Sequence, residues 1–462
     1  MSKMKIQQSL DLDNNKKSGP VECLGQTFPS DETRREHYLK LLAEKLKDPE
    51  FRKTSGFPIG SDEDILRLSD PPYYTACPNP FLADFVRVYG KPYDPAEEYR
   101  REPFAVDVSE GKTDQLYKAH GYHTKVPHLA IVPSLLHYTL PGDLVLDGFC
   151  GSGMTGVAAQ WCGTAPDAYR TSIEERWKTG GLGKPQWGAR RVILGDLGPA
   201  ATFIADNYNI PFDVKAFEAA GRVLLESIKS EIGWMYETRH TDGRKAIINY
   251  TVWSEVFSCP ECSGEVNFVE EALDEETKRV HDEFPCPNCG AKLTKKKLER
   301  LYETRFDAAI GESVKAPTRK PVLINYSVGK AKFEKTPDEE DLALVEKAAS
   351  MKPPVEVPTG KLPYMHMTHE RARIDDAGVT HLHHFFLPRA AQALAVMWRR
   401  AISESNTRLR NMMLFFVEQA ITGMSVLNRY SPSHFSQVNR SLTGVYYVAS
   451  QHSEVSPWYI LD

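Results

Sequence analysis

The feature that most constrains this chain is a glycine-rich loop set between a short apolar run and a helical segment. The run Leu144-Val-Leu146 has the length and composition of a buried parallel strand, and the turn Pro141-Gly-Asp143 precedes it. The loop Asp147-Gly-Phe-Cys-Gly-Ser-Gly-Met-Thr-Gly156 then leads into a helix that begins near Val157. Glycines let the backbone approach a ligand closely, and a helix start offers free N–H groups. We therefore expect a ligand-binding loop, and its lack of a Lys-Ser/Thr ending disfavours ATP.

The elements after the loop predict the fold class. Val192-Ile-Leu194 has the pattern of a second buried strand that ends close to Asp196, and residues 202–208 have that of a helix. Strand, loop, helix, strand and helix in this order predict a Rossmann-like α/β fold with a parallel sheet. Residues 164–190 are rich in glycine, tryptophan, arginine and proline, and we expect them to be a loop insertion.

Two helices are expected upstream of the loop. Residues 31–47 form a charged segment with leucines and a tyrosine on one face. Residues 123–139 place Leu129, Val132 and Leu135 on one buried face. Pro133 in the middle of this segment would break or kink the helix, because proline has no N–H to donate.

The residues from His123 through the motif His-Thr-Lys-Val-Pro and onward to the loop ending at Gly156 resemble the amino-directed DNA methyltransferases of permuted motif order, which modify adenine N6 or cytosine N4. That subgroup joins a Thr-x-Lys-Pro helix to an Asp-Pro-Phe-Cys-Gly-Ser-Gly-Thr-Thr loop, and this chain differs at Val126, Gly148 and Met154. The resemblance implies S-adenosyl-L-methionine as the methyl donor and a Cys150 without covalent chemistry. The implied cofactor residues are Thr124, Lys125, Asp147, Phe149, Cys150, Gly151, Ser152, Gly153, Thr155 and Asp196. Asp196 would accept hydrogen bonds from the ribose hydroxyls, and the alternative is that it caps a helix.

A second motif of that family matches Asp70-Pro71-Pro72-Tyr73. An exocyclic amine needs acceptors for its hydrogens, because its lone pair is delocalised into the ring. The resemblance implies that the Asp70 carboxylate and a carbonyl aimed by the rigid prolines supply them, while Tyr73 stacks on the extruded base. The preceding residues 62–69 predict a short helix or a weak strand, so a proline-rich surface turn is the alternative.

Two Cys-x-x-Cys pairs predict a metal site. Cys259-Pro-Glu-Cys262 and Cys286-Pro-Asn-Cys289 have 23 residues between them, and Gly264 and Gly290 follow to allow tight turns. Four thiolates form a closed tetrahedral site for a structural Zn²⁺. We expect the ligands Cys259, Cys262, Cys286 and Cys289 in a zinc-ribbon insert over residues 251–300. The basic run at 292–300 either contacts DNA phosphates or is only a solvated face.

Composition and length complete the expected organisation. The 462 residues carry a formal net charge of -5, eight cysteines and no long apolar span or signal peptide, so we expect a soluble cytoplasmic protein. We expect a disordered N-terminus at 1–30, a methyltransferase domain at 31–250 and a largely helical recognition region at 301–462. A strand is expected at 444–449, polar residues at 428–440 either contact nucleic acid or form a plain loop, and five histidines between 366 and 384 are expected to be solvated or hydrogen-bonded rather than metal-bound.

Three functions follow as expectations. The first is transfer of a methyl group from S-adenosyl-L-methionine to adenine or cytosine in double-stranded DNA, in restriction–modification or phage defence. The second is a cofactor-binding half or specificity subunit that acts with a second methyltransferase chain or a restriction subunit. Its basis is the weak strand before Asp70 and the chain end soon after a candidate strand. The third is an RNA base methyltransferase.

Overall fold

The computed structural model describes residues 19–92, 94–96, 98–274, 276–434, 437–438 and 446–462. The chain divides into two compact units, one of Met1–Val214 with Asn406–Asn411 and one of Lys215–Ser405 with Met412–Asp462. Disorder was expected through residue 30, and residues 1–18 lie outside the described residues. The expectation is wrong for residues 21–28, because strands β1 (Val21–Cys23) and β2 (Gln26–Phe28) form a hairpin there. The buried side chains of Cys23, Leu24 and Phe28 attach it to the core.

Helices dominate the N-terminal part of the first unit. Helix α1 (Asp31–Leu46) agrees with the prediction, and a capping box between Ser30 and Thr33 fixes where it begins. Tyr38, Leu42 and Leu46 are its buried hydrophobic side chains. The remaining helices up to the glycine-rich loop are α2 (Pro49–Arg52), α3 (Asp62–Leu68), α4 (Leu82–Tyr89), α5 (Gln115–Lys118) and α6 (His128–Tyr138).

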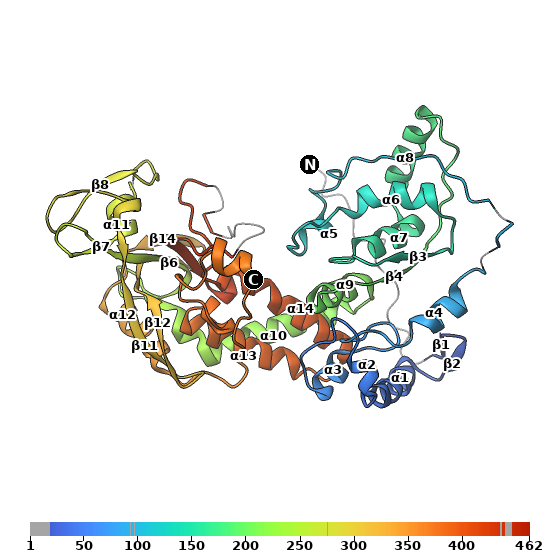
Figure 1. Cartoon of the computed structure of the whole chain (residues 1–462), viewed down its shortest axis with the longest axis horizontal. Helices are drawn as coiled ribbons and strands as arrows, with labels where there is room; N and C mark the ends of the chain where they lie inside the picture. Colours follow the sequence, from blue (N-terminus) through green and yellow to red (C-terminus); the bar gives the residue numbers. More distant parts are fainter. Residues whose placement is uncertain (1–18, 93, 97, 275, 435–436, 439–445) are drawn as a thin grey trace. The chain divides into compact units, whose positions relative to one another are not determined.

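A parallel strand pair carries the glycine-rich loop. Strand β3 (Leu144–Asp147) pairs with β4 (Arg191–Leu194) in parallel, with Asp147 opposite Leu194. Helix α7 (Met154–Thr164) follows β3 and α9 (Pro199–Asn209) follows β4, so these four predicted elements are present in the expected sequence, with one further helix between α7 and β4 (Figure 1). In the part of the chain that the structure describes, this sheet has two strands. The unit is therefore mixed α/β and contains this parallel strand pair.

Two predictions near this sheet are wrong in part. Residues 164–190 are not simply a loop insertion, because they contain helix α8 (Asp167–Thr179), whose Ile173 and Trp177 are buried in one core with side chains of α6 and α7. Pro133 does not break α6, which continues from 128 to 138. A proline at 133 removes the N–H that would bond the carbonyl of Leu129, and the Tyr169 hydroxyl of α8 donates to that carbonyl at 2.8 Å instead.

The second unit is built on an antiparallel sheet around one long strand. Strand β6 (Lys245–Ser258) is rich in β-branched and aromatic residues and is almost entirely buried. One of its edges pairs with β13 (Arg319–Val328) and β10 (Glu299–Arg300), and β14 (Ala331–Lys335) continues the sheet beyond β13. The other edge pairs with β5 (Glu237–Arg239), β15 (Gln451–Val455) and β7 (Glu265–Asn267).

The expectation of a largely helical region at 301–462 is only partly right. Helices α12 (Glu339–Ser350), α13 (Pro388–Ile402) and α14 (Thr407–Met424) are present, but residues 302–335 form strands. Among them is the hairpin of β11 (Tyr302–Asp307) and β12 (Glu312–Pro317). The C-terminal strand lies at 451–455 and not at 446–449, while residues 444–445 of the expected strand lie outside the described residues. The remaining elements are α10 (Val214–Ile232), η1 (Gly233–Tyr236), α11 (Phe268–Ala272), β8 (Glu283–Pro285), β9 (Lys292–Thr294), η2 (Lys295–Lys297), η3 (Met367–Arg371), η4 (Leu382–Phe385) and α15 (Pro457–Leu461).

A buried ion pair ties α13 to this sheet. Arg389 donates to both carboxylate oxygens of Glu454 on β15, at 2.8 and 2.9 Å, and to the hydroxyl of Thr251 on β6. Trp253 donates to the same carboxylate at 3.1 Å. These bonds satisfy two charges that burial would otherwise make costly. No helix among the described residues is long and apolar enough to cross a membrane.

Candidate functional site

Glycines shape the loop between β3 and α7. Gly151 and Gly153 have φ of 50° and 78°, in the left-handed region that favours glycine. A Cβ on Gly153 would lie 2.7 Å from the Cβ of Ala205 on α9, so a larger residue would separate the two helices. The Asn209 side chain donates to the Gly153 carbonyl at 3.0 Å. The loop is thus packed closely against α9.

Two aspartates hold the loop in this conformation. Asp147 accepts from the N–H of Phe149 at 3.1 Å and from the hydroxyl of Thr155 at 2.6 Å. Asp196 accepts from the N–H of Gly151 at 3.0 Å and from that of Gly198 at 2.9 Å. Gly198 is the residue that caps α9. Asp196 therefore joins the loop after β3 to the turn after β4, at the carboxyl ends of both strands.

Cys150 lies inside this arrangement. Burial raises the pKa of the thiol to about 12, and the negative charges of Asp196 and Asp147 act in the same direction. The thiol is therefore protonated at neutral pH, and a thiol is a poor nucleophile. This chemistry agrees with the non-covalent role expected for Cys150.

The predicted residues before α6 make other contacts. The Lys125 ammonium donates to the carbonyls of Tyr117 and His120, and burial lowers its pKa to about 8. Thr124 has a left-handed φ of 66°, and its hydroxyl bonds the adjacent His123 carbonyl. Tyr122 of the same segment, which the sequence did not single out, does contact the loop. Its ring lies 3.0 Å from where a Cβ on Gly151 would be.

The Asp-Pro-Pro-Tyr segment follows α3, a helix and not a strand. A buried arginine, Arg34 of α1, donates to Asp70 Oδ1 at 2.9 Å and to the Pro71 carbonyl at 2.6 Å, and its guanidinium stacks on the Tyr73 ring. The Pro72 carbonyl accepts from the Asn79 amide at 2.8 Å. Oδ1 of Asp70 and the carbonyls of both prolines are thus already engaged within the protein.

A cavity of about 540 Å³ lies in the first unit. Residues 73–79 line one part of its wall. Strand β4, the turn at Asp196 and helix α9 line another part. Of the predicted residues, Tyr73 and Asp196 line this cavity, whereas Asp70, the lysine–threonine pair and the loop residues 149–155 do not. Asp206 on α9 also lines it, beside Arg408 at 3.4 Å. No motif in the sequence pointed to Asp206.

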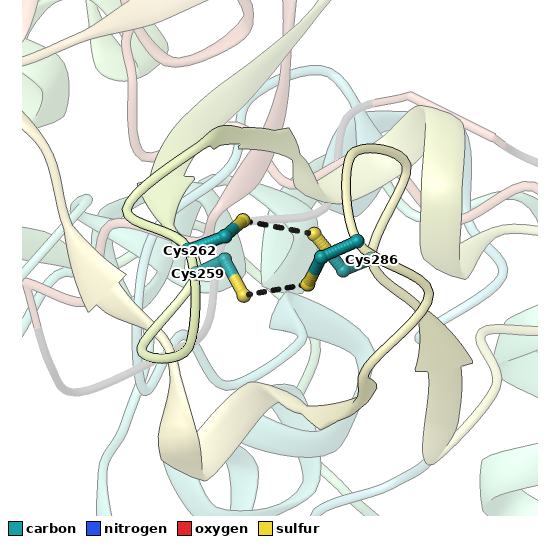
Figure 2. Close-up of side chains that lie close together, drawn as sticks. Cys259, Cys262 and Cys286 are labelled. Carbon is teal, nitrogen blue, oxygen red and sulfur yellow. Dashed lines mark hydrogen bonds between the residues drawn. The ribbon is translucent and has the colours of Figure 1, made fainter.

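The four predicted zinc ligands come together in the second unit. Their sulfur atoms all lie within 4.8 Å of one another, and Figure 2 shows the two pairs facing each other. The Cys259–Cys289 and Cys262–Cys286 sulfur distances are 3.9 and 3.8 Å. Zinc–sulfur bonds of about 2.3 Å in a tetrahedron place sulfurs about 3.8 Å apart. The group can therefore hold zinc with little rearrangement.

The turns of the two knuckles differ in one detail from the prediction. Gly290 has the expected left-handed φ of 72°, but in the first knuckle Ser263, with φ of 58°, takes the equivalent position. Gly264 is needed for a different reason. A Cβ there would lie 2.3 Å from the amide nitrogen of Asn288 on the other knuckle.

The residues expected to contact DNA have varied surroundings. Lys296 and Lys297 are exposed, whereas Arg300 bonds the buried Glu255 carboxylate at 3.1 Å. Asn428 is fully buried and donates to carbonyls of residues 423 and 453. Residues 435–436 and 439–440 of the same polar stretch lie outside the described residues.

One part of the chain is similar to a known protein family. No curated protein and no solved structure gives a significant match. Residues 31–164 match a protein family described as DNA methylase. The matched stretch contains both the Asp-Pro-Pro-Tyr segment and the glycine-rich loop. Residues 31–164 of this chain are therefore similar to the DNA methylase family.

Proposed function

We propose that this chain binds S-adenosyl-L-methionine and transfers its methyl group to an exocyclic amino nitrogen of adenine or cytosine in double-stranded DNA. The cavity of about 540 Å³ carries the proposal, because Asp196 lies on its wall together with Tyr73 of the Asp-Pro-Pro-Tyr segment. The match of residues 31–164 to the DNA methylase family supports DNA as the substrate. On this proposal the substrate motif precedes the cofactor loop in the chain, which is the permuted order.

The first unit has features that suit this cofactor. Pockets of roughly 300–1,000 Å³ are typical of small-molecule sites, and the cavity falls within this range. The Asp196 carboxylate on its wall is the type of group that binds ribose hydroxyls. The Ser152 hydroxyl is buried and makes no hydrogen bond among the described residues. It does not line the cavity, so a ligand would satisfy it only by reaching the glycine-rich loop itself.

The proposed chemistry requires acceptors at the substrate amine. S-adenosyl-L-methionine, when bound, supplies a methyl group on a positively charged sulfur. The amine nitrogen forms the new bond to carbon as the carbon–sulfur bond breaks, and an amine proton passes to an acceptor. We propose the Asp70 carboxylate and the Pro71 carbonyl as these acceptors, with Pro72 fixing the backbone and Tyr73 stacking on the base. This requires the base to replace Arg34 at Asp70 Oδ1 and at the Pro71 carbonyl, or to use Asp70 Oδ2.

Transfer of label from radioactive S-adenosyl-L-methionine tests the function. We expect label in double-stranded DNA and none in tRNA, and label in tRNA alone would favour an RNA base methyltransferase. Asp196→Ala should weaken cofactor binding at least tenfold in calorimetry. Asp167→Ala, at an exposed aspartate of α8, is the matched control and should leave the affinity unchanged. Equal affinities of both variants would contradict the role of Asp196.

A second variant tests the role of Asp70. We expect Asp70→Asn to reduce methylation at least 100-fold while the variant binds cofactor like the parent protein. Thermal unfolding must be measured in parallel, because Asp70 also neutralises the buried Arg34. Full methylation combined with a lower Tm would show that Asp70 serves only the ion pair.

A second candidate function is a cofactor-binding subunit that needs a second methyltransferase chain or a restriction subunit. The observation in its favour is the two-stranded parallel sheet, since parallel sheets are normally covered on both faces. Leu146 of β3 is 74% exposed. This candidate predicts cofactor binding without methyl transfer by the purified chain, and activity only after a partner is added. Methylation by the chain alone would exclude it.

We further propose that the four cysteines hold one structural Zn²⁺ in a zinc-ribbon insert, and that the exposed lysines Lys296 and Lys297 contact DNA phosphates. Replacing both lysines with glutamine should reduce DNA affinity and the dependence of that affinity on salt, because each phosphate contact releases counterions. Unchanged binding and salt dependence would assign these lysines to a solvated surface.

A further inference from the structure

A second cluster of metal-ligand side chains lies in the second unit and shares no residue with the cysteine group. Asp307 is the last residue of β11, and His383 and His384 are neighbours in η4. The Nε2 atoms of both histidines lie 2.7 Å from the same oxygen, Oδ2 of Asp307. We propose that these three side chains bind a first-row divalent cation, with Zn²⁺ as the expected ion.

The donor atoms converge from two separate segments of the chain. All three lie within 4.8 Å of one another. The other oxygen of Asp307 accepts from the N–H of Ala309 at 2.9 Å, which fixes the carboxylate and turns Oδ2 toward the histidines. Two adjacent residues of a short 3-10 helix thus direct both rings to one point, which hydrogen bonding alone does not require.

The hydrogen bonds of this cluster leave one nitrogen of the His383 ring without a partner among the described residues. A neutral imidazole carries one N–H, so His383 uses its only proton on Asp307 when no ion is bound. Its Nδ1 atom is buried and makes no hydrogen bond among the described residues. The His383 and His384 side chains are only 9% and 3% exposed, and that of Asp307 is 10% exposed. Water therefore has little access to this group.

A neighbouring threonine can support the metal-bound form of the second ring. Histidines that bind a metal through one nitrogen usually donate the other N–H to a fixed acceptor. Without an ion, Nδ1 of His384 accepts from the Thr380 N–H at 3.3 Å. Metal binding at Nε2 would move the ring proton to Nδ1 and replace that bond, and the Thr380 hydroxyl, 3.2 Å from Nδ1, can accept the proton. The hydroxyl also lies 3.0 Å from Nδ1 of His381, whose ring centre is 5.2 Å from that of His384.

The distances suit a small cation. Zinc binds histidine nitrogen and carboxylate oxygen at about 2.0–2.1 Å, which places tetrahedral donors about 3.4 Å apart. The present nitrogen–oxygen distances of 2.7 Å are those of hydrogen bonds, so the rings would move apart by less than about 1 Å. Two imidazoles and one carboxylate leave a fourth position for water. Calcium and magnesium are disfavoured, because they prefer an all-oxygen shell.

Such an ion would fix the β11–β12 hairpin to the segment that precedes α13. The hairpin is a separate two-stranded sheet. Its strand β11 brings Asp307 to the histidines from 76 and 77 residues away in sequence. A metal bridge across such a long segment would stabilise the second unit by linking parts that are distant in the chain.

Metal content measured by mass spectrometry tests the site. After loading with Zn²⁺ and removal of excess ion, we expect two ions per chain, and one after the double change His383→Ala and His384→Ala. His366→Ala, an exposed histidine of the same sequence span, is the control and should retain two. Asp307→Asn preserves the size of the side chain and should also lose one ion, so a folding defect of the double variant does not decide the result. Two ions in the Asp307→Asn and double variants would overturn the proposal.

Cobalt substitution separates this site from the cysteines. Co²⁺ bound by thiolates gives strong sulfur-to-metal charge-transfer absorption, whereas nitrogen and oxygen ligands give only weak visible bands. A Cys286→Ser and Cys289→Ser variant should still bind one Co²⁺, with the weak bands alone. Binding of no cobalt by that variant would show that the histidine cluster is a hydrogen-bonded group without a metal.

Discussion

A single buried carboxylate, that of Asp206, gives the wall of the cavity an unusual pH dependence. Burial raises its pKa to about 7, and the positive charge of Arg408 only partly opposes this shift. An unfolded aspartate titrates near 3.9. The folded state therefore holds this proton more tightly than the unfolded state, so the contribution of Asp206 to stability is greatest below pH ~4 and is lost as the pH rises through about 7.

This linkage gives a prediction for Asp206→Asn. The free energy of unfolding of the parent should fall relative to that of the variant between about pH 4 and pH 7. Above that range the difference should stay constant. Urea unfolding at several pH values measures it, and Asp167→Asn, at an exposed aspartate, should give a curve parallel to that of the parent. Parallel curves for Asp206→Asn would show that its pKa is not raised.

At the scale of elements, helix α6 depends on a neighbour to tolerate its internal proline. The Tyr169 hydroxyl of α8 donates to the Leu129 carbonyl, which Pro133 leaves without its helical donor. We expect Tyr169→Phe to lower the free energy of unfolding by about 1 kcal/mol, because a hydrogen bond at a half-buried carbonyl is lost. Chemical denaturation measures the change.

A second tyrosine supplies the control for this prediction. The Tyr99 hydroxyl donates to the Tyr138 carbonyl at the end of the same helix, at 2.9 Å, but this ring is 63% exposed. Water can replace an exposed bond, so Tyr99→Phe should cost less than about 0.5 kcal/mol. Equal effects of the two substitutions would mean that Tyr169 does not compensate for Pro133.

At the scale of the whole molecule, the division into two units predicts independent responses to metal loss. The cysteine group belongs to the second unit, and the cavity with Asp196 to the first. Cys286→Ser should therefore release zinc and increase proteolysis within residues 259–294. It should change the affinity for S-adenosyl-L-methionine, measured by calorimetry, by less than about twofold. Loss of cofactor binding in this variant would show that the two units are energetically coupled.

Local sequence patterns predicted those features that depend on neighbouring residues. Strands β3 and β4, the loop glycines and the cysteine knuckles were all predictable, because each follows from backbone geometry or ligand spacing within a few residues. Helix α8 was not predicted, although Tyr169, Ile173 and Trp177 recur every four residues. The glycines and prolines around this segment instead predicted a loop. The apolar side chains of α8 are recognised as buried only in the tertiary structure, where they pack against α6 and α7.

The glycine-rich loop itself was determined by the sequence alone, since its left-handed residues and the flanking strand and helix are local properties. What surrounds it was decided only by tertiary structure. Arg34 reaches Asp70 from 36 residues away, and Asp196 bonds Gly151 from 45 residues away. Asp307 meets His383 in the same manner, from 76 residues away. A residue's sequence neighbours fix its backbone conformation, but its charge partners and burial depend on contacts between distant segments, which no local pattern encodes.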